Sequence, residues 1–300
     1  MTLGSRTTRS GFDALTSVTT LLQRARLAHP TAGLWEAADF QWWWRAERHS
    51  DAYPQTFWLD DEGSPIAAAM ITSWTSHVAL TPLAIPSIGD DDRIVITACG
   101  LDQAAAAGVE TLEVEVDEHD DALRTFLEEC GFAVDPSEAY AESWLSALDR
   151  PVVSPLAAGY RLRRRIDDSG PHHNVNKQPE FERRLGETSL YRPDLDLVVR
   201  TDDGEVAAYG LFWLDPATGI GMVEPMRTID AHQRRGLARH VLTAGIDALV
   251  VAGAERIKIC WELDNPAAGD LYRSVGFEPV RQTVVLRGPV MGAVVDHRPG

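Results

Sequence analysis

The six residues Gln233-Arg234-Arg235-Gly236-Leu237-Ala238 constrain the fold of this 300-residue chain more than any other segment. They follow an apolar, strand-like run at Ile220–Thr228 and open a helix-like run at Leu237–Val251. A helix that begins directly after a short turn leaves its first backbone N–H groups unpaired at the positive end of the helix dipole. Such a helix start binds phosphate groups, and the arginines of the turn add positive charge. The segment therefore predicts a phosphate or pyrophosphate site, with an ordinary strand-to-helix turn as the alternative.

The two halves of the chain resemble each other when one is offset against the other by 145 residues. The offset aligns residues 112–116 with 257–261, and Gly131-Phe132 with Gly276-Phe277. A repeat of this length indicates duplicated domains rather than a solenoid. We therefore expect two domains, at residues 1–150 and 157–300, joined by a segment that contains Pro151 and Pro155.

Each half shows the same succession of strand-like and helix-like segments. Helical periodicity covers residues 12–28, 35–48, 94–107 and 122–129 in the first half, and 179–190, 237–251 and 266–275 in the second. Alternating and β-branched runs predict strands at 56–59, 66–74 and 111–116, and at 160–165, 196–200, 206–214, 219–228, 256–261 and 278–286. These segments predict an α+β fold in which each of two tandem domains has a mixed, mainly antiparallel sheet flanked by helices.

Composition narrows the class of protein. The chain is 44% hydrophobic, which is enough for real cores, and no apolar run approaches the length of a membrane span. Its first residues lack the apolar stretch of a signal peptide. Cys99, Cys130 and Cys260 are far apart and form no paired motif, so neither a disulfide framework nor a metal site is expected. These features predict a cytoplasmic protein that does not act at a membrane.

Charge is distributed unevenly along the chain. Residues 1–150 hold 9 arginines, no lysine and 25 acidic residues, whereas residues 151–300 hold 19 basic and 20 acidic residues. The net charges of the two halves are therefore −16 and −1. The acidic half makes nucleic acid an unfavourable partner, while a polyanionic ligand meets a nearly neutral half that is locally rich in arginine. The acidity itself suits solubility or, alternatively, attraction of a cationic substrate.

A second motif follows the turn by about thirty residues. The run Asn265-Pro266-Ala267-Ala268 opens a helix well, because Asn caps helix N-termini and Pro fits the first helical position. Tyr272 lies seven residues after Asn265, which places both side chains along one groove, and Gly276-Phe277 ends the segment. Together the two motifs resemble those of the GNAT superfamily of N-acetyltransferases, Arg/Gln-x-x-Gly-x-Gly/Ala and Asn-x-x-Ala…Tyr-x-x-x-Gly-Phe. The resemblance covers residues 157–287 well and the first half in outline.

The resemblance implies acetyl-CoA as co-substrate and assigns roles to residues. The strand end Met226-Arg227-Thr228 would hold the pantetheine arm through main-chain hydrogen bonds and supply an N–H group to the thioester oxygen. Asn265 would contact this arm or order a water, or serve only as a helix cap. Tyr272 would protonate the leaving thiolate, or would only pack against the sheet. Backbone amides that would hold the CoA pyrophosphate belong to Gln233, Arg234, Arg235, Gly236, Leu237, Ala238 and Arg239.

A general base is expected on the strand before the turn, because the attacking amine must be neutral. Glu224 is a carboxylate on that strand. In several members of the resembled family the base lies two residues earlier, where this chain has Met222, and positions two apart share one strand face. The alternatives for Glu224 are a buried structural carboxylate and a substrate-binding group. His172 and His173 are expected in a surface loop, with a catalytic role as the alternative.

The first half lacks the residues of both motifs. In place of the turn it has residues 88–93, Ile-Gly-Asp-Asp-Asp-Arg, whose three carboxylates would repel a pyrophosphate. Leu127 and Asp120 stand where the second half has Tyr272 and Asn265. We therefore expect a first domain that has the fold but neither binds CoA nor catalyses. Large aromatic side chains favour cores and interfaces, so its tryptophans are expected between the domains or at the acceptor pocket: Trp35, Trp42, Trp43, Trp44, Trp58, Trp74 and Trp144.

These observations predict an enzyme with one working site. The expected reaction transfers an acetyl group from acetyl-CoA directly to a primary amine of a small molecule or peptide. A non-catalytic acyl-CoA-binding or sensor protein is the alternative, since it would keep the Gly236 turn without needing Tyr272 or Glu224. The first domain would serve as a scaffold, help to form the acceptor site or mediate dimerisation, so the chain would be a monomer or a homodimer.

Overall fold

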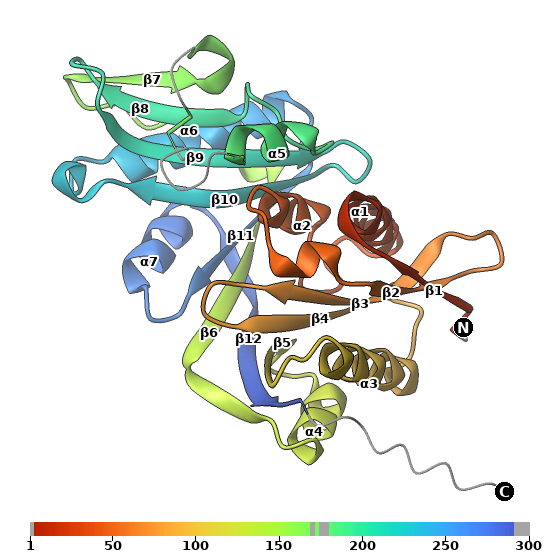
Figure 1. Ribbon diagram of the computed structural model, residues 1–300. Helices are drawn as coiled ribbons and strands as arrows, with labels where there is room; N and C mark the ends of the chain where they lie inside the picture. Colours follow the sequence, from red (N-terminus) through yellow and green to blue (C-terminus); the bar gives the residue numbers. More distant parts are fainter. Residues whose placement is uncertain (1–2, 169–171, 174–179, 291–300) are drawn as a thin grey trace, which may run out of the picture. The chain divides into compact units, whose positions relative to one another are not determined.

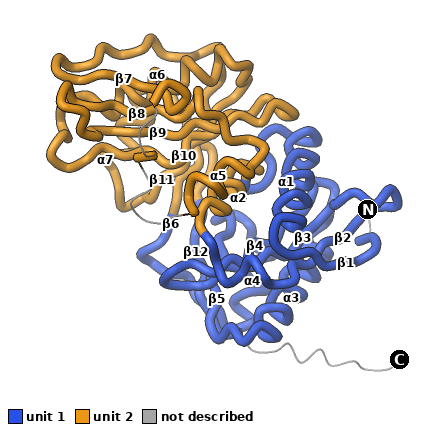
Figure 2. The backbone as a smooth tube through the Cα atoms, turned by 45° about the horizontal axis from the view of Figure 1, so that its top comes forward, with its two compact units in different colours: residues 1–35, 47–139, 283–300 blue, residues 36–46, 140–282 orange. Residues whose placement is uncertain are grey.

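The computed structural model describes residues 3–168, 172–173 and 180–290 (Figure 1). Its contacts divide the chain into two compact units, shown in different colours in Figure 2. Unit 1 contains residues 1–35, 47–139 and 283–300, and unit 2 contains residues 36–46 and 140–282. The units therefore interleave along the chain, where the sequence suggested one division near residue 150.

Unit 1 is a sheet with helices packed against it. Its strand order is β1-β2-β3-β4-β5-β12, and the neighbours are antiparallel except for β4 and β5. The last strand, β12 (Glu278–Pro289), comes from the C-terminal part of the sequence. The other elements are β1 (Ser5–Arg9), α1 (Gly11–Ala28), β2 (Gln55–Leu59), β3 (Pro65–Ser73), β4 (Val78–Ala84), α3 (Asp90–Ala106), β5 (Thr111–Asp117) and α4 (Asp121–Glu129).

Unit 2 repeats this plan. Its strand order is β6-β11-β10-β9-β8-β7, and the neighbours are antiparallel except for β10 and β11. The outer strand, β6 (Ala133–Ser146), comes from the first half of the sequence. The other elements are α2 (Ala37–Trp44), β7 (Tyr160–Arg164), α5 (Phe181–Glu187), β8 (Asp196–Thr201), β9 (Val206–Asp215), β10 (Ile220–Thr228), α6 (Leu237–Val251), β11 (Arg256–Glu262) and α7 (Pro266–Val275). Short 3₁₀ turns in the chain lie at His49–Ala52, Ala147–Asp149, Arg165–Asp167 and Asp230–His232.

The final strand of each half completes the sheet of the other unit. In unit 1, Leu286 of β12 lies opposite Val114 of β5. In unit 2, Trp144 of β6 lies opposite Lys258 of β11. This exchange explains why the two units interleave although the repeat in the sequence is regular. The predicted fold class, a mixed and mainly antiparallel sheet flanked by helices in tandem, is confirmed.

The sequence pattern predicted the bounds of some helices and strands better than those of others. The ranges of α6 and α7 agree with those expected. Strands β1, β4 and β6 were not predicted, because Pro82 lies inside β4 and Pro136 with several acidic residues lies inside β6. Helix α3 begins at Asp90 rather than at residue 94, since Gly89 takes the N-cap position. In the part of the chain that the structure describes, no helix is both long and apolar enough for a membrane crossing.

Helix α2 is part of the first half of the sequence but packs within unit 2. Its Trp42 ring lies 6.3 Å from the Trp213 ring and 6.0 Å from the Phe181 ring, both edge-on. The Arg184 guanidinium lies 3.8 Å from the Trp44 ring centroid and donates a hydrogen bond to the Trp44 carbonyl at 2.6 Å. Aromatic and cation–π contacts therefore hold α2 against α5 and β9.

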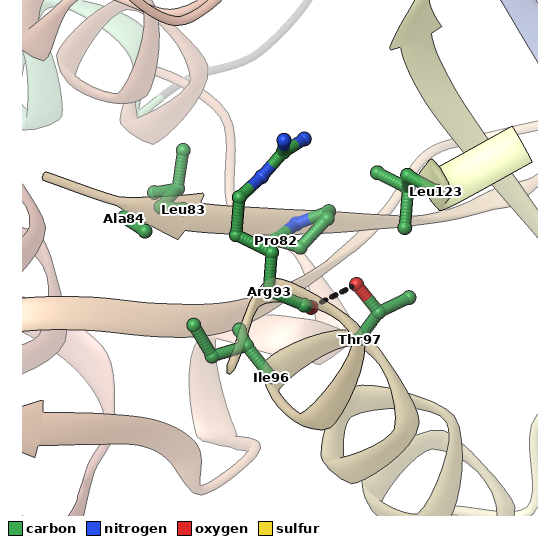
Figure 3. A pocket seen from close by; sticks show the side chains of 7 residues that line it. All are labelled: Pro82, Leu83, Ala84, Arg93, Ile96, Thr97 and Leu123. Atoms are coloured by element: carbon green, nitrogen blue, oxygen red, sulfur yellow. Dashed lines mark hydrogen bonds between the residues drawn. The ribbon is translucent and has the colours of Figure 1, made fainter. Parts of the chain in front are cut away.

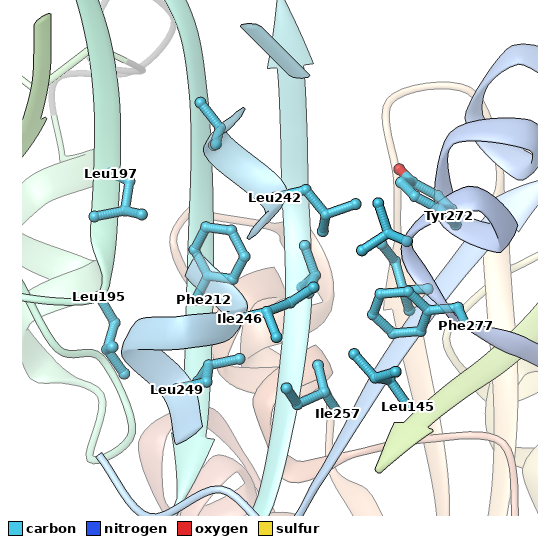
Figure 4. Close-up of a cluster of buried hydrophobic side chains, with 14 of the residues drawn as sticks. Leu145, Leu195, Leu197, Phe212, Leu242, Ile246, Leu249, Ile257, Tyr272 and Phe277 are labelled. Atoms are coloured by element: carbon cyan, nitrogen blue, oxygen red, sulfur yellow. The ribbon is translucent and has the colours of Figure 1, made fainter. Parts of the chain in front are cut away.

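A hydrophobic cluster joins α6 to the sheet of unit 2 (Figure 4). In the close-up, Phe212, Ile246, Leu249 and Ile257 converge from strands and helix. A Cβ atom at Gly245 would lie 1.9 Å from the Phe212 ring, so glycine is needed for α6 to approach β9 this closely. The packing fixes the start of α6, which follows the turn at residues 233–236, relative to β10.

A buried ion network connects α2, β6, β11 and β12 in unit 2. The Lys258 ammonium lies 3.1 Å from Glu142 and 3.5 Å from Glu36, and all three side chains are almost fully buried. Arg281 reaches Glu142 at 3.3 Å, and the Trp144 indole donates to the same carboxylate at 2.7 Å. The Lys258 and Arg281 cations hold the pKa of Glu142 below its usual value even though burial opposes this.

We expect Lys258→Ala to lower the free energy of unfolding by about 3–5 kcal/mol, because it leaves Glu36 and Glu142 buried without their ammonium partner. Urea unfolding followed by circular dichroism measures the change. Arg161→Ala is the matched control, since it removes an exposed ion pair with Asp202 and should cost less than about 1 kcal/mol. Equal decreases in the free energy of unfolding for the two substitutions would contradict a stabilising role for the buried Lys258 network.

Candidate active site

Strands β10 and β11 diverge after Met222, where their backbone pairing ends. Their parallel pairing covers residues 220–222. The pairing of β10 with β9 shifts register between Val223 and Met226, an interval in which Pro225 has no N–H to donate, and resumes at 226–228. The edge of β10 that faces β11 is therefore open along residues 226–228. This is where the sequence predicted main-chain contacts with a pantetheine arm.

The turn at 233–236 ends in a glycine with left-handed backbone conformation. Gly236 has φ of +77° and takes the N-cap position of α6 without a side-chain cap. No atom lies within 4 Å of the place where its Cβ would be. Buried Leu237 anchors the helix start in the hydrophobic cluster, whereas Gln233, Arg234 and Arg235 are exposed. The first N–H groups of α6 thus have no side-chain cap, which is the condition that an anion-binding helix start requires.

Two further groups fit a long, polar ligand in this opening. The hydroxyl of Thr228, the last residue of β10, is buried and has no hydrogen-bond partner among the described residues, whereas such groups in native proteins normally have one. Arg239, exposed on the first turn of α6, donates hydrogen bonds to the Ser274 carbonyl and hydroxyl on α7. The start of α6 thus lies beside α7, which carries the second motif.

Helix α7 is positioned by its cap and by close packing. The Asn265 side-chain oxygen accepts a hydrogen bond from the Ala268 N–H at 3.2 Å, which leaves the Asn265 amide nitrogen to donate elsewhere. A Cβ at Gly269 would lie 2.6 Å from the Trp261 indole nitrogen, so glycine lets α7 lie against β11. The Tyr272 ring packs edge-on against Trp261 and Phe277 at 5.7 and 6.3 Å. Its hydroxyl points away from Phe277 and Leu145 in Figure 4.

Glu224 lies at the interruption of β10 and has an unusual carboxylate. Burial and the nearby Asp39 carboxylate raise its pKa from 4.5 to about 7, against the opposing influence of Arg45 and of a hydrogen bond from Trp42. The Trp213 indole fixes the backbone here by donating to the Glu224 carbonyl at 2.7 Å. A carboxyl with a pKa near 7 takes up and releases a proton at neutral pH, as a general base must.

The residues around Glu224 on α2 were not found from the sequence. Asp39, Trp42 and Arg45 are spaced three apart, which places them along one side of the helix. The Arg45 guanidinium lies 3.6 Å from the Trp42 ring centroid, so these side chains also support each other. The spacing is visible in the sequence, but nothing local indicates that this side packs against β10. Of the tryptophans singled out from the sequence, Trp42 lies beside Glu224 and donates a hydrogen bond to its carboxylate.

Tyr272 and Glu224 influence each other electrostatically. Burial raises the pKa of Tyr272 to about 12, and the Glu224 carboxylate contributes to this increase, as does Cys260. The phenol is therefore fully protonated at neutral pH. When Glu224 binds a proton it loses its charge, and the pKa of Tyr272 must then decrease. The charge of Glu224 thus contributes to the pKa of Tyr272, and its loss on protonation favours proton release by the phenol.

His172 and His173 are not in an exposed loop, so this expectation was wrong. His172 is 3% exposed, and its Nε2 lies 2.7 Å from the Asp196 carboxylate. Burial lowers the pKa of His173 to about 4, although Asp196 opposes the shift. The Tyr191 hydroxyl donates to Asp196 at 2.9 Å, and burial raises its pKa. Sequence reasoning missed Asp196 and Tyr191, because their proximity to the histidines arises only when β8 packs.

The corresponding position in unit 1 is occupied by ion pairs of Arg93. A small pocket there is lined by Pro82, Leu83, Ala84, Arg93, Ile96, Thr97 and Leu123 (Figure 3). Arg93 forms ion pairs with Asp90 and with Asp120, the counterpart of Asn265. These contacts bridge the starts of α3 and α4, and three acidic residues occupy the first turn of α3. The arrangement favours the prediction that the first domain does not bind CoA.

Comparison with known sequences identifies the family of this site. The Acetyltransferase (GNAT) family profile matches residues 162–277. A mycothiol acetyltransferase from Clavibacter michiganensis subsp. michiganensis is 26% identical over 225 residues, which cover 74% of this chain and 67% of that protein. A mycothiol acetyltransferase from Beutenbergia cavernae is 31% identical over 146 residues, which cover 43% of this chain and 48% of that protein.

Solved structures share the fold. A tandem GNAT protein from the clavulanic acid biosynthesis pathway superimposes with a TM-score of 0.70 at 15% identity and covers 96% of this chain and 99% of that one. A GCN5-related N-acetyltransferase from Sphaerobacter thermophilus has a TM-score of 0.62 at 16% identity, with coverage of 100% and 98%. Residues 162–277 therefore form an acetyltransferase domain of the GNAT family, and the chain is an N-acetyltransferase.

Proposed function

We propose that the chain transfers an acetyl group from acetyl-CoA to a primary amine of a small molecule, at the single site of unit 2. The observation that carries this proposal is the opened edge of β10, which has the Gly236 turn at one end and the coupled pair of Glu224 and Tyr272 beside it. Because the curated relatives are mycothiol acetyltransferases, amines of low molecular weight are the first acceptors to assay.

In the proposed binding mode, backbone N–H groups from Gln233 to Arg239 hold the pyrophosphate. Residues Met226, Arg227 and Thr228 pair through their main chain with the pantetheine amides, and the Thr228 hydroxyl gains the partner that it lacks. The Asn265 amide nitrogen donates to the same arm. Acetyl-CoA supplies the activated acyl group as a thioester.

In the proposed reaction, Glu224 accepts a proton from the acceptor ammonium group, and the neutral nitrogen attacks the thioester carbonyl. A backbone N–H at the open end of β10 stabilises the oxyanion, a kind of contribution worth about 3–4 kcal/mol. Tyr272 then donates its proton to the thiolate as the carbon–sulfur bond breaks, the second proton lost by the attacking nitrogen restores the phenol, and Glu224 releases its proton to solvent. The negative charges of Glu224 and Asp39 favour an acceptor that arrives as a cation.

We expect Tyr272→Phe to lower kcat by about 10²- to 10⁴-fold while the affinity for acetyl-CoA changes by less than about twofold, because the ring still packs but has no proton to donate. Thiol release with a panel of small amines measures transfer, and calorimetry measures binding. Tyr53→Phe in unit 1 is the control and should behave as the parent protein. If the parent protein acetylates no amine yet binds acetyl-CoA, the protein is an acyl-CoA sensor instead.

The pH dependence should follow Glu224. A base must be deprotonated, so kcat/KM should fall as pH decreases through about 7, the pKa of this group. Trp42→Phe removes a hydrogen bond that favours the charged form of Glu224, so the pKa of Glu224 should rise. The acidic side of the pH profile of kcat/KM should then move to higher pH. Trp43→Phe on the same helix should leave the acidic side of the profile in place. If Glu224→Gln shows the same decrease of kcat/KM at low pH as the parent protein, Glu224 is not the base.

Acetyl-CoA should bind with a stoichiometry of about one per chain, since ion pairs of Arg93 occupy the corresponding position in unit 1. Gly236→Val should weaken binding about 5- to 30-fold, because a β-branched residue in left-handed conformation costs about 1–2 kcal/mol. Gly89→Val tests the equivalent position of unit 1, where φ is −79° and valine fits, and should have no effect. Two binding sites per chain, or weaker binding in Gly89→Val, would refute a single site in unit 2.

A further inference from the structure

A second group of polar residues in unit 2 lies outside the proposed mechanism. His172 and His173 precede α5, and Asp196 is the first residue of β8. The three side chains are at most 3% exposed, and one nitrogen or oxygen atom from each lies within 4.8 Å of the others. Such a concentration of ligand-type atoms in a protein interior requires a partner of some kind.

Two of these atoms have no hydrogen-bond partner in the described part of the chain. They are Nε2 of His173 and Oδ1 of Asp196, which lie 3.6 Å apart. Leaving one buried polar atom unpaired costs about 1–3 kcal/mol, and here two face each other. A neutral imidazole nitrogen and a carboxylate oxygen are both electron-pair donors, so a cation between them would satisfy both at once.

We propose that His172, His173 and Asp196 bind one divalent transition-metal ion of the zinc class. Ligand atoms at about 2.0–2.1 Å from a tetrahedral ion lie about 3.3 Å from each other, close to the 3.6 Å between His173 and Asp196. His172 and Asp196 are 2.7 Å apart, so the ion replaces the proton that they share and separates them by about 0.6 Å. A water molecule supplies the fourth ligand.

The donor set selects the class of ion. Two imidazoles and one carboxylate suit Zn²⁺ or Co²⁺, whereas Ca²⁺ and Mg²⁺ require mainly oxygen. The surroundings also hold the ligands in place, as outer groups do at metal sites. The Tyr191 hydroxyl donates to Asp196, the His172 backbone N–H donates to Glu182 at 2.8 Å, and the rings of Phe181 and Tyr209 pack against the two histidines.

Metal binding to the full chain tests the proposal without reference to activity. The protein is freed of metal with a chelator, dialysed against Zn²⁺ and analysed by mass spectrometry for bound zinc. We expect about one Zn²⁺ per chain and a rise in Tm of about 5 °C that the chelator reverses. Co²⁺ should produce the visible absorption of a four-coordinate ion with nitrogen and oxygen ligands.

His173→Ala should lose the bound Zn²⁺, the Co²⁺ absorption and the rise in Tm. His119→Ala, which changes an exposed histidine of unit 1, should keep all three. If His173→Ala does not fold, the proposal is tested on the parent protein alone, by the chelator-reversible rise in Tm and by the Co²⁺ spectrum. Absence of bound metal in the parent protein, or its full retention in folded His173→Ala, overturns the proposal. Acetyl-CoA binding is measured on the same samples, so failure of this site is distinguishable from failure of the proposed function.

Discussion

The parting of β10 from β11 is the constraint on which the candidate site depends. A backbone edge in the middle of a sheet normally has every N–H and C=O paired with its neighbour. Here the pairing ends after Met222, and Pro225 removes one donor where the register with β9 shifts. The released edge offers main-chain groups to a ligand, and the hydrophobic cluster under α6 holds the uncapped helix start at the same opening. Without this interruption, the turn at Gly236 would be a helix start like any other.

The chemistry of the site follows from a balance between burial and charge at Glu224. A carboxylate without Asp39 and burial would titrate near 4.5 and would be a weak base at neutral pH. Without Trp42 and Arg45 the pKa of Glu224 would be higher still, and the carboxyl would stay protonated at neutral pH. The phenol of Tyr272, with a pKa of about 12, is a poor acid while Glu224 is charged. Proton uptake by Glu224 removes its contribution to the raised pKa of Tyr272, which favours proton release by the phenol.

The first half of the chain contributes more to unit 2 than a scaffold would. Helix α2 brings Asp39, Trp42 and Arg45 to Glu224, and its N-cap residue Glu36 joins the ion network around Lys258. Strand β6 supplies Glu142 to the same network. The first half, in which Arg93 and Asp120 form an ion pair near the start of α3, thus supplies residues that set the pKa of the proposed base in the other half.

The sequence by itself determined the features that depend on local order. A strand, a turn with Gly236 and an apolar helix are contiguous, and so are Asn265, Tyr272 and the Gly-Phe ending, which is why α6 and α7 could be predicted with their bounds. The tertiary structure decided which distant segments meet. The exchange of β6 and β12, the approach of α2 to Glu224, and the burial of His172 and His173 against Asp196 all join residues separated by 23 or more positions. Periodicity reports which side of an element is buried, but it carries no information on which partner covers that side, and so these contacts required the folded chain.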